Sequence, residues 1–322
     1  MSFPQLINIL KIVTGYLLSR LTRRVYHWGK PATLSIEPTN SCNLRCPECP
    51  SGMKTLTRRR GNMDLPLFRD IIKQLSPELY HLTLYFQGEP YLNPGFFDMV
   101  KFAHAKGIRV DTSTNGHYLD RNNAAATIES GLDKLIISVD GTDQESYEKY
   151  RIGGTYTQVI NGIREIVRQK KEKKSNKPFI ELQFLVLKSN QHQIEGIKKL
   201  GRELGVNRVA LKSAQFYDFE KGNPQIPDID KYSRYKQSND GIWRIKNRLP
   251  NHCFRMWRGC VITWDGQVVP CCFDKDATMV MGSVEETRFE DIWHNKAYQR
   301  FRWKILHKRS STEMCRNCTE GM

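Results

Sequence analysis

Residues 33–50, TLSIEPTNSCNLRCPECP, join a short β-rich run to a loop with three cysteines. In Thr33–Glu37, Leu and Ile alternate with polar residues, which predicts a strand. The loop behind it carries Cys42, Cys46 and Cys49, with three and then two residues between them. Thiolates this close repel one another unless a cation or protonation relieves the repulsion. The loop is therefore a candidate metal site.

The choice of metal follows from the number of ligands that the loop offers. Zinc would need a fourth protein ligand, and no other Cys or His stands nearby in the sequence. An iron–sulfur cluster held by three cysteines would leave one iron open to an external ligand. A zinc knuckle completed from elsewhere in the chain is the alternative.

Outward from this loop, β-rich runs alternate with helical stretches that end at turn signals such as Ser76-Pro77, Gly107 and Gly131. Six βα units over 31–216 predict a parallel α/β sheet, either open and doubly wound or a partial barrel. The expected strands are Thr33–Glu37, His81–Phe86, Arg109–Thr112, Lys134–Val139, Phe179–Leu187 and Arg208–Lys212. The expected helices are Leu65–Leu75, Gly95–Ala105, Asn122–Ser130, Tyr156–Lys174 and Gln191–Leu204.

The rest of the chain divides by composition. Segment 217–250 is polar with little periodicity and is expected to connect two domains, whereas 251–322 holds six of the nine cysteines. Asp265-Gly266 between two β-rich runs predicts a hairpin, and an amphipathic helix is expected at about 288–306. Two tight cysteine groups in a chain of 322 residues favour metal ligation in a reducing compartment over a disulfide framework.

The spacing of Cys42, Cys46 and Cys49 after a first strand resembles the signature of the radical S-adenosylmethionine (SAM) superfamily, and the resemblance runs through most of 31–322. It implies a partial (β/α)6 TIM-like barrel in which the three thiolates hold a 4Fe–4S cluster and SAM chelates the fourth iron. It also implies that reductive cleavage of SAM gives a 5′-deoxyadenosyl radical, which abstracts a substrate hydrogen. The cofactor performs this chemistry, and the protein orients it and excludes water.

Motifs at successive strand ends resemble the segments that line the SAM site in this family. Gln87-Gly88-Glu89-Pro90 is similar to its GGEP motif, with Gln in place of the first Gly, and implies that Gly88 and Glu89 contact the SAM amino group. Ser113-Thr114-Asn115-Gly116 and Ser138-Val139-Asp140-Gly141 follow the next strands. By the same resemblance, Ser138 binds SAM, Arg151 meets its carboxylate and Leu211 contacts the adenosyl group.

The second cysteine group resembles the SPASM/twitch extension, which carries auxiliary 4Fe–4S clusters. Because a full SPASM domain continues past its CxxC with further cysteines, we expect one auxiliary cluster here. Its implied ligands are Cys253, Cys271, Cys315 and Cys318, with Cys260 or Cys272 as replacements. A zinc site with four thiolates is the alternative.

Acid–base residues are less defined. In sulfatase-maturing relatives an Asp follows the third auxiliary-domain cysteine, whereas here Cys272 follows Cys271, which disfavours sulfatase maturation. Asp274, which lies two residues after Cys272, is the catalytic acid–base candidate that we name. Tyr85, Asp111 and His117 are further candidates, in no order of preference. His117, after a glycine turn, is expected at the surface.

The N-terminal segment 1–30 is expected to form a basic amphipathic helix. Within 5–28 there are four Lys or Arg and no acid, and the apolar stretch is too short and too charged to span a bilayer. Its polar face carries Asn8, Lys11, Gly15, Ser19 and Thr22, opposite Leu6, Leu10, Val13, Leu17 and Leu21. We favour a helix that caps the domain with its apolar side, and the alternative is a helix on a membrane surface.

The net charge of +16 favours an anionic partner, and Arg58-Arg59-Arg60 beside the cysteine loop could bind an anionic substrate. The main hypothesis is a cytoplasmic radical SAM oxidoreductase or modifying enzyme, peripheral to the inner membrane face if the helix binds there. Its substrate would be an alcohol that is oxidised or a peptide that is modified, and its reductant flavodoxin or ferredoxin. An RNA-modifying radical enzyme is a second hypothesis, although no RNA-binding signature is visible. A non-catalytic, metal-stabilised interaction protein at a membrane surface is the third.

Overall fold

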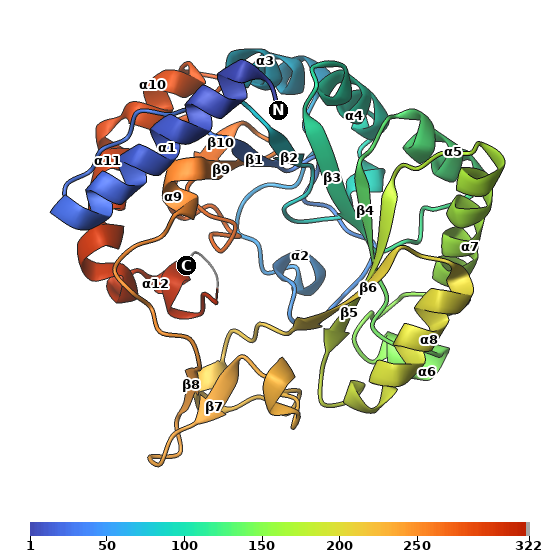
Figure 1. Ribbon diagram of the computed structural model, residues 1–322. Helices are drawn as coiled ribbons and strands as arrows, with labels where there is room; N and C mark the ends of the chain where they lie inside the picture. The colour runs from blue at the N-terminus through green and yellow to red at the C-terminus, as the bar shows by residue number, and fades with distance from the viewer. Residues whose placement is uncertain (320–322) are drawn as a thin grey trace. The chain divides into compact units, whose positions relative to one another are not determined.

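The computed structural model describes residues 1–319, which form two compact units (Figure 1). The first unit comprises residues 1–41, 56–110 and the chain from Leu249 onward. The second unit comprises residues 42–55 and 111–248. The three cysteines of the first group thus belong to the second unit, and the six of the second group belong to the first unit. The last three residues of the predicted auxiliary domain, 320–322, lie outside the described residues.

In the first unit, strands follow the order β11-β10-β9-β1-β2. Their bounds are β1 (Thr33–Ile36), β2 (His81–Thr83), β9 (Gly259–Ile262), β10 (Gln267–Val269) and β11 (Gly282–Ser283). β1 pairs in parallel with β2 on one side and with β9 on the other, whereas β10 is antiparallel to β9. The predicted hairpin is therefore confirmed, and Gly266 has the positive φ of 76° that its turn requires. Nothing in the sequence indicated that this hairpin pairs with β1.

Some helices of the first unit begin at a residue whose side chain caps them. The helices of this unit are α1 (Phe3–Thr22), α3 (Leu65–Leu75), η1 (Pro90–Leu92), α4 (Phe96–Ala105), α9 (Arg255–Arg258), α10 (Phe289–His294), α11 (Lys296–Lys308), η5 (Arg309–Ser311) and α12 (Glu313–Arg316). For example, the Asp64 side chain accepts from Leu67 N at the start of α3, which buries Phe68, Ile71, Ile72 and Leu75.

The second unit repeats strand and helix in the order β3-β4-β5-β6, with all neighbours parallel. Its strands are β3 (Arg109–Thr114, shared with the first unit at its start), β4 (Lys134–Ser138), β5 (Phe179–Val186) and β6 (Arg208–Ser213). Its helices are α2 (Pro50–Met53), α5 (Arg121–Glu129), α6 (Gln144–Glu148), α7 (Tyr156–Glu172), η2 (Gln191–Gln193), α8 (Ile194–Leu204), η3 (Phe219–Lys221) and η4 (Asp230–Tyr232). The predicted α/β class with a mostly parallel sheet is confirmed.

Two predicted segments differ from the structure. The connecting segment 217–250 contains an antiparallel pair, β7 (Tyr235–Gln237) and β8 (Trp243–Ile245), because the Tyr235 side chain is buried and anchors it. The helix expected at 288–306 is two helices, α10 and α11. The side chain of Asn295 caps the second by accepting from Tyr298 N at 2.8 Å, which breaks the helix at that residue.

The N-terminal helix exists, but the face it buries is the reverse of the one we favoured. α1 packs on the first unit with Gln5, Asn8, Ile12, Gly15, Tyr16 and Ser19, and its leucines face outward. Small and polar residues form the buried face because Gly15 lets the helix approach the segment at Tyr26 closely. A Cβ at Gly15 would lie 2.9 Å from Tyr26 O. No helix within residues 1–319 is long and apolar enough to cross a membrane.

Candidate functional site

The cysteine loop of the second unit lies on an apolar floor. Cys46 is buried, and Cys42 and Cys49 are half-buried. Cys46 packs into a cluster of mostly apolar side chains, and Cys42 and Cys49 pack against it. The other buried members are Leu44, Tyr150, Leu187, Ala214, Phe216, Phe219, Ile226 and Tyr235. Such a floor keeps water from one side of the thiols.

Backbone and amide contacts hold this loop in place. Gly52 in α2 approaches so closely that a Cβ would lie 2.6 Å from Cys46 N and 2.8 Å from Cys46 O. Asn115, which follows β3, lies with its Nδ2 2.8 Å from Asn43 Oδ1 and 3.9 Å from Cys42 Sγ. The sequence had placed Asn115 in a site-lining segment, and the structure shows how it supports the loop.

A half-buried cation lies beside Cys46. Arg151 donates from Nε to Asp140 Oδ2 at 2.6 Å, and its Nη1 lies 3.8 Å from Cys46 Sγ. Asp140 is buried and also accepts from Leu185 N at 2.6 Å, so this pair is fixed by the sheet. Burial raises the pKa of Cys46, and Arg151 opposes that rise because its charge favours the thiolate. Arg151, expected near the SAM carboxylate, thus lies beside the thiol of Cys46.

Two other predicted SAM contacts belong to the same unit. Ser138 is the last residue of β4, is buried, and lies opposite Gln183 of β5. Leu211 is half-buried in β6, opposite Phe184.

The surface position expected for His117 is wrong. It is buried, its Nδ1 lies 3.0 Å from Asn115 Oδ1, and its Nε2 accepts from Thr155 N at 2.8 Å. Burial lowers the pKa of His117. The glycine turn that suggested exposure instead folds the residue inward, and His117 supports Asn115.

The first unit holds the predicted amino-group contacts. Gly88 has φ of +76°, and a Cβ there would lie 2.5 Å from Thr39 O and 2.7 Å from Ser41 O. Glu89 is buried, and its backbone N donates to Ser41 O at 2.8 Å. The motif therefore packs on the segment that leads into the cysteine loop, and only glycine fits at position 88.

The second group of cysteines clusters within the first unit. Burial is the main cause that raises the pKa of Cys253 and raises the pKa of Cys315 to about 11, and the charge of Cys318 contributes to both rises. The pKa of Cys271 is raised by its hydrogen bond with Cys272, by burial and by the charge of Cys253. Electrostatic interactions therefore link Cys253 to the other three predicted ligands, Cys271, Cys315 and Cys318.

The two spare cysteines differ. Cys260 is buried, and burial raises its pKa to about 12, opposed by a hydrogen bond with Tyr298 and by Arg302. Cys272 lies beside Cys271, with its Sγ 2.7 Å from Arg255 Nη1. Cys260 therefore lies against aromatic and guanidinium groups, and Cys272 lies between Cys271 and Arg255.

Sequence reasoning missed Arg309. Its side chain is buried, its Nη1 donates to His252 O at 2.9 Å, and its Nη2 lies 3.6 Å from Cys318 Sγ. Arg309 lowers the pKa of Cys253 and Cys315 because it stabilises their thiolates. A basic residue six positions before a cysteine is an ordinary feature of a helix end, so nothing in the sequence marked it.

The acid–base candidates have other contacts. Asp274 is buried and fastens its own loop, because it accepts from Thr278 N at 2.9 Å and from Met279 N at 2.9 Å. Tyr85 is half-buried, and its carbonyl accepts from Ser35 Oγ at 2.7 Å. Asp111 is half-buried in β3.

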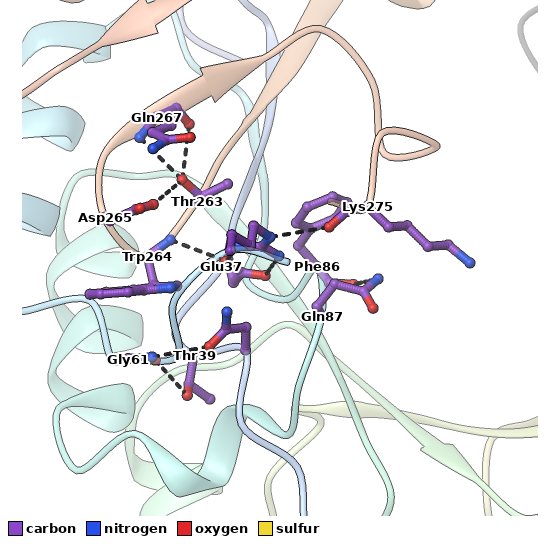
Figure 2. Close-up of polar contacts among 12 residues, drawn as sticks. Glu37, Thr39, Gly61, Phe86, Gln87, Thr263, Trp264, Asp265, Gln267 and Lys275 are labelled. Atoms are coloured by element: carbon purple, nitrogen blue, oxygen red, sulfur yellow. Dashed lines mark hydrogen bonds and ion pairs between the residues drawn. The ribbon is translucent and has the colours of Figure 1, made fainter. Parts of the chain in front are cut away.

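Arg58 is part of a buried ion pair. Its Nη1 and Nη2 donate to the two oxygens of Glu37 at 2.5 and 2.6 Å, and the side chains are 8% and 0% exposed. Its Nε donates to Lys275 O at 3.2 Å, and Trp264 N donates to Glu37 at 3.2 Å (Figure 2). The pair joins the end of β1 to the loop after Cys271. Arg58 is thus engaged within the fold, whereas Arg59 and Arg60 are exposed.

The donor set fits iron–sulfur ligation. Both groups consist of cysteine thiols with an arginine beside them, half-buried Arg151 in the first group and buried Arg309 in the second. Thiolate is the ligand that iron–sulfur clusters take from proteins. Within residues 1–319, no three Cys, His, Asp or Glu side chains are arranged as a ready metal-binding group. The assignment of the two cysteine groups as cluster ligands is therefore based on their positions in the sequence and on the chemistry of thiols.

Comparisons with known proteins agree with these features. The family model of the radical SAM superfamily matches residues 36–211, and that of an iron–sulfur cluster-binding domain, SPASM, matches residues 253–319. The tungsten-containing aldehyde ferredoxin oxidoreductase cofactor-modifying protein of Pyrococcus furiosus is 29% identical over 317 residues, covering 89% of this chain and 86% of its own.

Two further relatives have named substrates. The S-adenosyl-L-methionine-dependent 2-deoxy-scyllo-inosamine dehydrogenase of Niallia circulans is 24% identical over 291 residues, covering 88% of this chain and 91% of its own. The structure of Streptococcus suis SuiB bound to precursor peptide SuiA has the same fold, with a TM-score of 0.64 and 13% sequence identity. The match covers 98% of this chain and 76% of the SuiB chain. The radical SAM model alone matches more than half of the 322 residues, so the chain belongs to the radical SAM superfamily.

Proposed function

We propose that this radical SAM enzyme abstracts a hydrogen atom from a carbon of an alcohol or peptide substrate and yields an oxidised or modified product. The observation that carries this is the loop of Cys42, Cys46 and Cys49, set on an apolar floor with Arg151 3.8 Å from the central thiol. When bound, the 4Fe–4S cluster and SAM supply reductive cleavage to a 5′-deoxyadenosyl radical.

Residues of the chain would bind and orient this cofactor pair. The three thiols would hold the cluster, and Asn115 and Gly52 fix the loop that carries them. Gly88 and Glu89 would contact the SAM amino group, Arg151 its carboxylate and Leu211 its adenosyl group. Ser138 would also bind SAM. Arg151 would serve both the carboxylate and the thiolates, because one guanidinium offers five N–H donors.

A single auxiliary 4Fe–4S cluster would be held by Cys253, Cys271, Cys315 and Cys318. Buried Arg309 would offset part of the negative charge of four thiolates. After the substrate loses a hydrogen atom, it must lose one more electron and one proton to become a carbonyl. The auxiliary cluster is the acceptor we propose for that electron, and flavodoxin or ferredoxin the reductant of the first cluster.

Two similar proteins support these two substrate classes. One relative is by name a 2-deoxy-scyllo-inosamine dehydrogenase, and one solved structure of the same fold is bound to a precursor peptide. The net charge of +16, with exposed Arg59 and Arg60 shortly after the three cysteines in the sequence, favours an anionic substrate of either class. We further propose that the enzyme works in the cytoplasm.

The proposal is tested with anaerobically reconstituted, dithionite-reduced protein. SAM should be converted to 5′-deoxyadenosine, and Cys46→Ala should abolish the conversion. With a substrate deuterated at the reacting carbon, deuterium should appear in 5′-deoxyadenosine. Cleavage that Cys46→Ala leaves unchanged would overturn the proposal. Two zinc and no iron per chain would instead support the metal-stabilised interaction protein, and co-purified nucleic acid would support RNA modification.

A further inference from the structure

The outward face of α1 is apolar along its whole length. Phe3, Leu6, Leu10, Leu17 and Leu21 are between 53% and 83% exposed. Their spacing of three, four, seven and four residues places them on one side of a helix with 3.6 residues per turn. Exposed apolar side chains gathered in one stripe are typical of an interaction surface.

The fold does not need this face, because the opposite face fastens the helix. Gln5 Nε2 donates to Leu79 O at 3.0 Å. The side-chain amide of Asn8 accepts a hydrogen bond from Lys30 N at 2.8 Å and donates one to Lys30 O at 2.9 Å. Near the other end, Tyr26 N donates to Ser19 Oγ at 2.8 Å. The helix is therefore held as a rigid element that presents its leucines to the outside, alongside α11 in the same unit (Figure 1).

Positive charges border the stripe on both sides. Lys11 follows Leu10 and Arg20 precedes Leu21, so each lies about 100° around the helix from the stripe, in opposite directions. Both are exposed, as is Arg24 just beyond the helix. No acidic residue occurs before Glu37, so nothing in this segment offsets the charge.

We propose that this face of α1 binds the surface of an anionic phospholipid membrane, with the helix axis parallel to it and the stripe inserted at the level of the headgroups. An interfacial helix combines an apolar face, which enters the lipid, with Lys and Arg at its edges, which meet lipid phosphates. An apolar protein groove would match the leucines but would not call for cations on both edges.

The test uses the full, cluster-loaded chain and vesicles of phosphatidylcholine, with or without phosphatidylglycerol. The protein should co-sediment with the anionic vesicles and only weakly with the neutral ones. Leu10→Gln/Leu17→Gln should lower the partition coefficient by about tenfold or more, because two leucines lose their burial in lipid. Lys11→Gln should lower it by about fivefold, and added salt should weaken binding.

The matched control is Ile229→Gln/Ile242→Gln, which changes two similarly exposed apolar residues far along the chain, at 39% and 43% exposure. It should bind vesicles like the unchanged protein. Both double variants should keep the thermal midpoint, since the altered side chains are exposed. Equal binding to neutral and anionic vesicles, or leucine changes without effect, would overturn the proposal. So would a dimer in lipid-free solution that the leucine variant abolishes, because the occupant would then be a second copy.

Discussion

Replacing Arg58 by Met tests whether the buried ion pair with Glu37 organises the first unit. The guanidinium gives Glu37 two hydrogen bonds of 2.5 and 2.6 Å and donates a third to Lys275 O. Without it, a carboxylate that is 0% exposed in its side chain would lose its counter-charge. Removing one partner of a buried pair costs about 3–5 kcal/mol of free energy of unfolding.

This cost converts into a measurable shift of the thermal midpoint. At about 2.1 cal/mol/K per residue, 322 residues unfolding in one transition have an entropy of about 680 cal/mol/K. The Arg58→Met variant should then melt about 4–7 °C lower, by circular dichroism of the cluster-loaded protein under anaerobic conditions. Burial already raises the pKa of Glu37 and Arg58 opposes it, so the penalty should shrink as the pH falls and Glu37 takes up a proton.

The neighbouring arginine provides the matched control. Arg60 is exposed, so Arg60→Met should leave the midpoint within about 1 °C, as surface substitutions usually do. The reasoning is refuted if both variants melt alike, or if the loss caused by Arg58→Met is the same at neutral and at acidic pH.

Three further outcomes are expected. Gly88→Ala should slow SAM cleavage and lower stability by more than the roughly 1–2 kcal/mol that a positive φ costs an alanine, because its Cβ would also meet Thr39 O. Cys271→Ser should remove about four iron atoms per chain, one cluster, from the reconstituted protein. Burial lowers the pKa of His27 to about 2. As the pH falls through about 6.5, His27 is therefore protonated in the unfolded chain but stays neutral in the folded chain. Stability should therefore fall with pH below 6.5 by up to about 1.4 kcal/mol per unit, and His27→Phe should flatten that dependence.

Each of these has its control. Gly107 has a similar φ of +72° but open space around its Cβ position, so Gly107→Ala should cost only the backbone strain. If it cost as much as Gly88→Ala, the contact with Thr39 would be irrelevant. Cys260→Ser should retain all the iron, and iron loss there with none for Cys271→Ser would reverse the ligand assignment. A pH dependence that His27→Phe leaves unaltered would mean that other groups set it.

The sequence predicted the parallel strands and most helices because their signals are local. α3 begins at its Asp64 cap and ends where Ser76-Pro77 stops it, so its bounds of Leu65–Leu75 could be predicted from the sequence. The hairpin at Asp265-Gly266 followed from turn chemistry alone. The cysteine spacing likewise resembles the signature of the radical SAM superfamily, and the match of the family model confirms that resemblance.

Features that depend on distant residues could not be predicted. The leucines of α1 suggested a buried apolar face, but the helix is fixed by partners at Leu79 and Lys30, whose positions only the folded chain defines. The sequence suggested that Arg58 could bind an anionic substrate together with Arg59 and Arg60, whereas in the fold it pairs with Glu37. Arg309 was missed for the same reason, as was the pairing of β9 with β1.

The central claim is that Cys42, Cys46 and Cys49 hold a cluster with one iron left for SAM. Electron paramagnetic resonance of the reduced Cys315→Ser/Cys318→Ser protein, which should retain only that cluster, tests it most directly. Adding SAM should change the g-values of the signal, because the amino and carboxylate groups of SAM bind the open iron. A spectrum that saturating SAM leaves identical would mean that protein groups already fill every position, and would contradict the claim.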